Sequence, residues 1–290
     1  MNNPIFKKEQ KVRARSPKLM LLLVGYNLGL VILMAIAFVS IYGTNHSIAK
    51  YQDTLILYIL IGVFQFALLL LIVPAFTAGT ITGEKERQTF DVLITVSKNP
   101  LIIILGKLSA SVSTMLLLII SSLPILAIAF SVGGLSLIDI ILYVVVCFME
   151  AAFIGSIGLF FSSFSKNTSK SIVLTYVTIL LLVVGTAMVL GILYLIVSKQ
   201  INYDEYSTQV IVTDLKNTVW LLLINPLVTV VALLMEQTGN VSLFAHYMNR
   251  VGSCNSFVLK HWVMISLGIQ MVIGMVLIHL SAKNIDRIKK

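Results

Sequence analysis

Six long apolar runs are the feature that most constrains how this chain can fold. They cover roughly residues 19–43, 55–80, 101–131, 136–163, 171–198 and 258–282. A run of about 20 apolar residues is long enough to cross a bilayer as a helix, and a helix satisfies its own backbone hydrogen bonds in lipid. Only 11% of the 290 residues are charged, whereas soluble proteins have about 25%. The sequence therefore predicts an all-α polytopic membrane protein with six transmembrane helices.

The basic residues are distributed unequally between the two sides of the predicted membrane. Sixteen fall on one side: Lys7, Lys8, Lys11, Arg13, Arg15, Lys18, Lys85, Arg87, Lys98, Lys107, Lys166, Lys170, Lys283, Arg287, Lys289 and Lys290. Five fall on the other: Lys50, Lys199, Lys216, Arg250 and Lys260. The positive-inside rule then predicts a multi-pass protein of the cell membrane with both termini in the cytoplasm. This sorting accounts for the net charge of +9 without a nucleic-acid partner.

The first 18 residues form a basic leader ahead of the first span. Asn3 followed by Pro4 is typical of an N-cap and a first helical position. Ser16-Pro17 is expected to end this helix before the span begins. We therefore expect a cytoplasmic N-terminal connecting helix in residues 1–18 and a six-span transmembrane domain in residues 19–290.

A short charged segment, Gly83 to Ser97, separates the second and third spans. The two acids and two bases in Glu84 to Arg87 cannot lie in lipid, so the segment must project into water. Thr89 is suited to cap a short helix that follows it. Three apolar residues share one face of that helix: Phe90, Leu93 and Ile94. A helix this short is unstable alone in water, so we expect it to dock against another surface.

Two ionisable residues in the apolar runs, Lys107 and Glu150, bear on the prediction. The third run of about 30 residues would be about 45 Å long as a helix, which exceeds the hydrocarbon thickness. Lys107 is therefore expected in the cytoplasmic headgroup region. Glu150 lies deep inside the fourth run, where an ionised group is costly unless it is paired or hydrated. Two interpretations stay open for Glu150: a substrate-path or proton-linked carboxylate, or a structural glutamate that faces other helices.

The longest polar region, residues 199–256, contains one apolar stretch from Val219 to Met235. Asn225-Pro226 interrupts this stretch, and a seventh span there would move the basic C-terminal tail outside. We therefore predict two short interfacial or re-entrant helices on the external face. Cys147 in the fourth run and Cys254 in the external region are expected at different depths, so no disulfide is predicted.

The sequence has no motif typical of catalysis or metal binding. Its four histidines never occur at i, i+4, and the motifs HExxH, GxSxG and GxxxxGK[ST] are absent. No cysteine–histidine cluster has the spacing of zinc ligands. We therefore expect no catalytic, cofactor-binding or metal-binding residues in this chain, which is not predicted to be an enzyme or to bind ATP through a P-loop.

Around the charged segment, the chain resembles the permease subunits of ABC exporters of the type-2 (type V) superfamily. The family pattern has two acids separated by one residue, then G-T, an aliphatic pair, a proline and a G-K. Seven residues match it in order: Glu84, Glu86, Thr89, Leu93, Pro100, Gly106 and Lys107. The chain departs from it with Gln88 in place of a glycine and Ile94 as the second aliphatic residue. The leader and Asn225-Pro226-Leu227 also resemble segments of this family.

The resemblance implies a permease that works with partner chains. Two permease chains, as a homodimer or a heterodimer, would form the pathway, and two separate ABC ATPase subunits would bind ATP and Mg²⁺. The segment at about 83–97 would be the coupling helix that the ATPases push. The resemblance assigns ATPase contacts to seven residues: Glu84, Glu86, Arg87, Thr89, Phe90, Leu93 and Ile94. The apolar spans are compatible with a hydrophobic drug, a lipid, a peptide or an antibiotic as substrate.

A secondary transporter or membrane scaffold without an ATPase partner remains an alternative. In that case Glu150 would be the proton-linked site. A co-purifying P-loop protein would favour the ABC permease. Transport that follows the proton gradient and ignores ATP depletion would favour the alternative.

Overall fold

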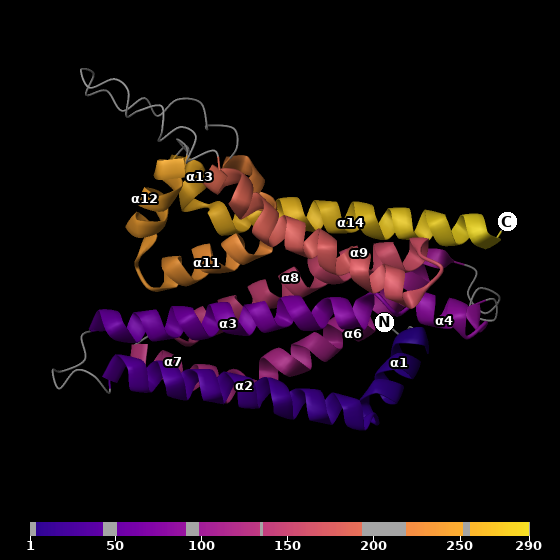
Figure 1. The fold of residues 1–290 in the computed structure, drawn as a ribbon, viewed down its shortest axis with the longest axis horizontal. Helices are drawn as coiled ribbons and strands as arrows, with labels where there is room; N and C mark the ends of the chain where they lie inside the picture. The colour runs from indigo at the N-terminus through magenta and orange to yellow at the C-terminus, as the bar shows by residue number, and fades with distance from the viewer. Residues whose placement is uncertain are drawn as a thin grey trace, which may run out of the picture.

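The computed structural model describes residues 4–42, 51–90, 99–133, 136–192, 219–251 and 256–289. Within these ranges the chain is helical and contains no strand (Figure 1). Six helices are long and apolar enough to cross a membrane: Pro17–Ser40, Leu55–Glu86, Pro100–Ser121, Leu137–Phe164, Thr168–Ile192 and Trp262–Asp286. The predicted all-α architecture with six spans is therefore confirmed.

The helices follow one another along a mostly up-and-down bundle (Figure 1). The longer ones are α1 (Pro4–Ala14), α2 (Pro17–Tyr42), α3 (Tyr51–Thr77), α6 (Pro100–Ser121), α7 (Leu123–Gly133), α8 (Leu137–Phe164), α9 (Thr168–Leu180), α11 (Pro226–Gln237), α12 (Val241–Val251) and α14 (Trp262–Lys289). The shorter ones are α4 (Thr82–Glu86), the π-helical η1 (Leu181–Gly185), the 3-10 helix η3 (Val219–Ile224) and α13 (Ser256–Lys260). Both ends of the described chain lie at the same end of the bundle as α4.

Helix α8 is the centre of this bundle and packs against α3, α6, α9, α11 and α14. Close packing against α3 depends on Gly158. A Cβ atom built there would lie 2.8 Å from the Cβ of Thr77 and 3.2 Å from the backbone nitrogen of Ala78. The Gly155–Gly158 stretch is therefore a packing surface between helices, since Gly155 also abuts the side chains of Leu108 and Thr77.

The predicted third span is divided into two helices, which corrects the expectation of one run over 101–131. Helix α6 ends at Ser121 and α7 begins at Leu123. Pro124 lacks the N–H that a continuous helix would pair with the carbonyl of Ile120, and its ring would clash there. Gln65 supports the break by donating a 2.8 Å hydrogen bond to the Ser122 hydroxyl. The apolar run over 101–131 is long because it includes both α6 and α7. Helix α6 alone need not extend beyond the membrane.

The apolar stretch before the last span forms two short helices, as predicted. Asn225 separates η3 from α11, and its side-chain oxygen accepts hydrogen bonds from the backbone of Leu227 and Val228. Its amide nitrogen donates to the carbonyl of Val183 at 3.1 Å and to the Thr186 hydroxyl at 2.8 Å. One side chain thus caps α11 and attaches it to the fifth span. Helices α11, α12 and α13 gather at the bundle end opposite α4 (Figure 1).

The C-terminal end of the leader helix also follows the prediction. Helix α1 ends at Ala14 and α2 starts at Pro17, so the chain turns at Ser16. Asn3, Cys254 and most of the segment after Phe90 lie outside the described residues. Cys147 is buried with a free thiol.

Candidate functional site

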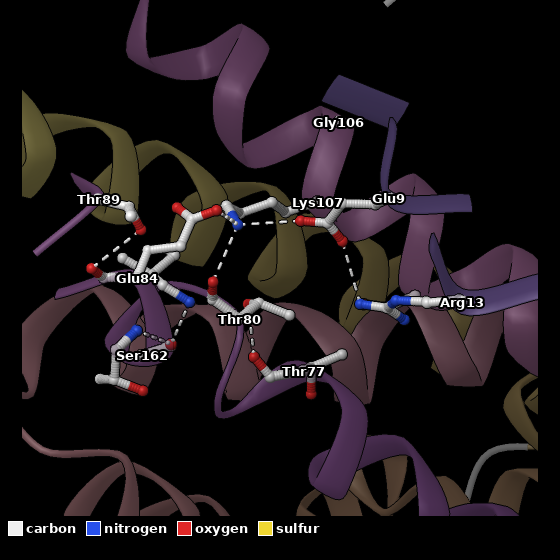
Figure 2. Close-up of polar contacts among 12 residues, drawn as sticks. Glu9, Arg13, Thr77, Thr80, Glu84, Thr89, Gly106, Lys107 and Ser162 are labelled. Carbon is white, nitrogen blue, oxygen red and sulfur yellow. Dashed lines mark hydrogen bonds and ion pairs between the residues drawn. The ribbon is translucent and has the colours of Figure 1, made fainter. Parts of the chain in front are cut away.

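The candidate site is a polar cluster around Lys107 at the end of the bundle that carries α1 and α4 (Figure 2). Lys107 belongs to α6, and its side chain is only 1% exposed. Its ammonium group lies 2.9 Å from a carboxylate oxygen of Glu9 and 2.9 Å from one of Glu84. It also donates a 2.9 Å hydrogen bond to the carbonyl of Thr80. One buried cation therefore joins α6 to α1, to α4 and to the turn that precedes α4.

Two neighbouring contacts hold α1 in this position. Arg13 donates a 3.1 Å hydrogen bond to the second carboxylate oxygen of Glu9 and a 3.2 Å bond to the Ser111 hydroxyl of α6. The guanidinium also lies over the ring of Phe76, 5.6 Å from its centroid. Burial lowers the pKa of the Arg13 guanidinium, and the Glu9 carboxylate opposes that shift. Glu9 thus receives one positive group on each of its oxygens, which makes its place against α6 specific.

Helix α4 is attached to the end of α8 by backbone and side-chain hydrogen bonds. The Ser162 hydroxyl accepts bonds from the backbone N–H groups of Ile81, at 3.0 Å, and Thr82, at 3.1 Å. These N–H groups belong to the first turn of α4 and have no partner within the helix. Lys85 donates to the carbonyls of Ser163 and Ser165. The position of α4 is therefore fixed by α8 as well as by Lys107.

The second carboxylate of α4 reaches the start of the fifth span. Glu86 accepts a 2.6 Å hydrogen bond from the backbone N–H of Thr168 and a 2.9 Å bond from its hydroxyl. The N-cap residue of α9, Asn167, makes no side-chain capping bond of its own. Glu86 therefore supplies the negative group that a helix N-terminus favours. Through its two acids, α4 contacts α6 and α9 directly.

The backbone conformation at Gln88, just after α4, is one that favours glycine. Gln88 has a φ of 58°, in the left-handed region that glycine adopts at the lowest cost. Glycine is the residue that the family often has at this position. Thr89 closes the turn, because its backbone N–H donates a 3.0 Å hydrogen bond to the carbonyl of Glu84. The helix that Thr89 is predicted to cap falls in residues 91–98, outside the described part of the chain.

Lys107 lies inside the protein, where Glu9 and Glu84 neutralise it, and its depth in the membrane stays a prediction. One predicted placement is corrected by the structure. Phe90 does not project toward a partner: it is 5% exposed and packs in a cluster with Ile81, Leu159 and Ile285. Leu93 and Ile94 lie outside the described residues. Of the predicted contact residues that the structure describes, Glu86, Arg87 and Thr89 are exposed, and Glu84 is partly buried beside Lys107.

Sequence reasoning missed the residues that other elements contribute to the cluster. Glu9, Arg13 and Ser162 are distant from α4 along the chain, and no spacing rule connects them to it. One signal was available for Glu9, because it is the sole acid in a leader of six basic residues. An isolated acid in a basic segment indicates a specific partner.

Glu150 lies away from this cluster, in the middle of α8, and is fully buried. Its carboxylate lies near Thr229 of α11 and Gln270 of α14, and neither carboxylate oxygen has a hydrogen-bond partner among the described residues. Thr229 and Ser266 share a 2.6 Å hydrogen bond, and Gln270 donates to Thr229 at 3.0 Å. Glu150 therefore faces a polar contact between three helices. Among the described residues, no group of three or more His, Cys, Asp or Glu could hold a metal ion.

Comparison with known proteins gives one match over most of the chain. The model of a family described as ABC-2 family transporter protein matches residues 35–283. The match includes α4, Lys107 and the central helix α8, and it starts after α1. No curated protein matches the chain.

Proposed function

The chain belongs to the ABC-2 family of transporter proteins, and we propose that it is the permease subunit of an exporter that separate ABC ATPase subunits drive. The observation that carries this proposal is the attachment of α4 to four other helices. Lys107 connects α4 to α6 and α1, Ser162 connects it to α8, and Glu86 connects it to α9. A short segment that is fixed to so many helices is suited to move them together.

The proposed mechanism is a rigid-body switch between two arrangements of the helices. The ATPases would bind ATP and Mg²⁺, because this sequence has no P-loop of its own. Their closure would displace α4, and the contacts of Lys107 and Glu86 would transmit this displacement to the spans. The excess of basic residues at this end supports a cytoplasmic location for α4 and both termini in a cell membrane. A second permease chain, identical or related, would complete the pathway.

The placement of the side chains divides the predicted contact residues into two groups. Glu84 and Phe90 act within the chain, since one pairs with Lys107 and the other packs in the core. Arg87 is exposed and is available to a partner, and Glu86 is exposed while it caps α9. We assign the apolar part of the ATPase contact to Leu93 and Ile94.

Replacing Leu93 and Ile94 together with alanine is expected to reduce ATPase co-purification about tenfold or more, because a few residues at the centre of an interface carry most of its binding energy. The permease should remain folded. The measurement is the ratio of ATPase to permease after purification of the intact complex, together with the thermal midpoint of the permease alone.

Leu137→Ala with Ile138→Ala is the matched control, since it removes an exposed pair of the same composition at the start of α8. Co-purification should be unchanged in this control. Equal ATPase recovery from both double variants would reject the assigned contact. Phe90→Ala is unsuitable for this test, because truncation of a buried phenylalanine destabilises a protein by about 3–5 kcal/mol.

The alternative of a proton-linked transporter depends on Glu150. We propose that Glu150 has a structural role between α8, α11 and α14, since it is fully buried and its carboxylate lies near Thr229 and Gln270. Glu150→Gln keeps the shape of the side chain and removes the charge, so ATP-dependent transport is expected to stay within about twofold of wild type. The thermal midpoint should be equal or higher by a few degrees. Loss of transport in a variant that is as stable as wild type would instead place Glu150 in the pathway.

A further inference from the structure

The two faces of α1 carry opposite kinds of contact. The face toward α6 presents Glu9 and Arg13, which are paired with each other and contact Lys107 and Ser111. Most of the exposed side chains around it are basic: Lys7, Lys8, Lys11, Arg15 and, at the start of α2, Lys18; Gln10 and Val12 are exposed as well. Glu9 is the sole acid among residues 4–18, and it faces inward. The outward surface of the leader is therefore positive, with no acid to offset it.

The position of α1 follows from the span that it precedes. Helix α1 ends at Ala14, and the candidate span α2 begins at Pro17. The first turn of α2 already exposes apolar side chains, with Met20 71% and Leu21 78% exposed. The exposed surface thus changes from basic to apolar within a few residues. The basic face of α1 must lie where the hydrocarbon ends and the headgroups begin, whichever side of the membrane this is.

We propose that the outward basic face of α1 binds the anionic headgroups of the adjacent bilayer leaflet. Charge complementarity supports this occupant, because several lysine or arginine residues beside a membrane surface attract anionic lipids. Long basic side chains also reach the headgroup level easily while their methylene groups lie against apolar surface. Val12, which is 65% exposed between the lysines, offers an apolar group to the same interface.

Headgroup binding on one face of α1 affects the polar cluster on the other. Glu9 contacts Lys107, and Lys107 contacts Glu84 of α4. A lipid surface that holds α1 in place also holds Glu9, one of the two carboxylates that pair with Lys107. Anionic lipid is therefore expected to stabilise the arrangement of α1, α6 and α4. This inference concerns the chain alone, so its failure would leave the proposed ATPase coupling untouched.

The test measures binding of phosphatidylglycerol to the purified full chain in neutral detergent, by native mass spectrometry at increasing lipid concentration. The variant replaces Lys7, Lys8 and Lys11 with glutamine. The control replaces Lys166, Lys170 and Lys283, which are exposed on other elements, with the same residue. Each basic residue beside an anionic surface strengthens binding about fivefold, so the variant is expected to bind at least about tenfold more weakly. The control should change binding less than about threefold.

Two results would overturn the proposal. One is equal weakening in the variant and the control; the other is equal binding of phosphatidylglycerol and phosphatidylcholine by wild type. The second result would leave a protein partner, such as the ATPase, as the occupant of this face.

A second measurement uses wild type alone, in case the variant fails to fold. Trypsin cleavage after Lys7, Lys8 and Lys11 is compared with cleavage after Lys166 and Lys170, in nanodiscs of neutral lipid and of phosphatidylglycerol. The ratio of cleavage in α1 to cleavage at Lys166 and Lys170 should fall about fivefold or more in the anionic nanodiscs at low salt. At high salt the ratio should return to its value in neutral lipid. A ratio that is independent of lipid charge would reject headgroup binding.

Discussion

Replacing Lys107 with methionine is expected to lower the free energy of unfolding of the chain by about 3–5 kcal/mol. Methionine keeps a long side chain in the buried space but removes the charge that lies 2.9 Å from both Glu9 and Glu84. Glu84 would then lose its cation and Glu9 would keep only Arg13, which is more costly than the loss of one exposed ion pair. Thermal denaturation in detergent should show the midpoint falling by about 10 °C.

Two controls make this result specific. Lys170→Met removes an exposed charge at the start of α9 and is expected to shift the midpoint by less than about 2 °C. A triple variant, Lys107→Met with Glu9→Gln and Glu84→Gln, removes the unpaired carboxylates and should recover most of the lost stability. A Lys107→Met variant that unfolds at the wild-type temperature would mean that the cluster contributes little to the fold.

The second large effect is expected at Gly158, where α8 crosses the end of α3. A methyl group in Gly158→Ala would overlap with Thr77 and lie 3.2 Å from the backbone nitrogen of Ala78, so α3 must move. Such overpacking costs about 1–3 kcal/mol or more. Because Thr77 and Ala78 lead directly into α4, the displacement should also reduce ATP-driven transport. The midpoint of thermal unfolding and the transport rate are the two measurements.

Gly268→Ala is the matched control, since Gly268 lies in α14 and a Cβ atom there meets nothing within 4 Å. Alanine in place of a helical glycine with open space is expected to stabilise the chain by about 0.5–1 kcal/mol. Opposite signs for the two glycine substitutions would establish that contact with α3 is the cause. If both variants were stabilised, the close approach of α8 and α3 would be wrong.

The architecture was predictable because lipid imposes a simple rule on the sequence. Apolar runs of sufficient length must be helices, so six runs predicted six spans, and Asn225-Pro226 predicted the break between η3 and α11. The break at Ser122 was not predicted, although Pro124 lies in the run, because a proline can kink a helix without ending it. That break depends on Pro124 and on a hydrogen bond from Gln65, which lies on another span.

The candidate site was predictable only in part. The charged composition of Glu84 to Arg87 located the segment that leaves the membrane, and the family pattern pointed to Lys107. The pairing of Lys107 with Glu9 could not be predicted from the sequence, because the two residues are 98 positions apart and no periodicity relates them. The burial of Phe90 was equally hidden, since a helical pattern shows which residues share a face and not which surface that face meets.

The fifth span contacts a different functional element at each of two places along its length. Glu86 of α4 binds its first residue, Thr168, and Asn225 at the start of α11 binds Val183 and Thr186 farther along. At helical rise these two places are about 25 Å apart. The second contact falls at and just after the π-helical turn η1, where the regular hydrogen-bond register is interrupted. An axial shift of this one helix would therefore change the cap of α11 directly, which gives the two ends of the bundle a mechanical connection that does not pass through α8.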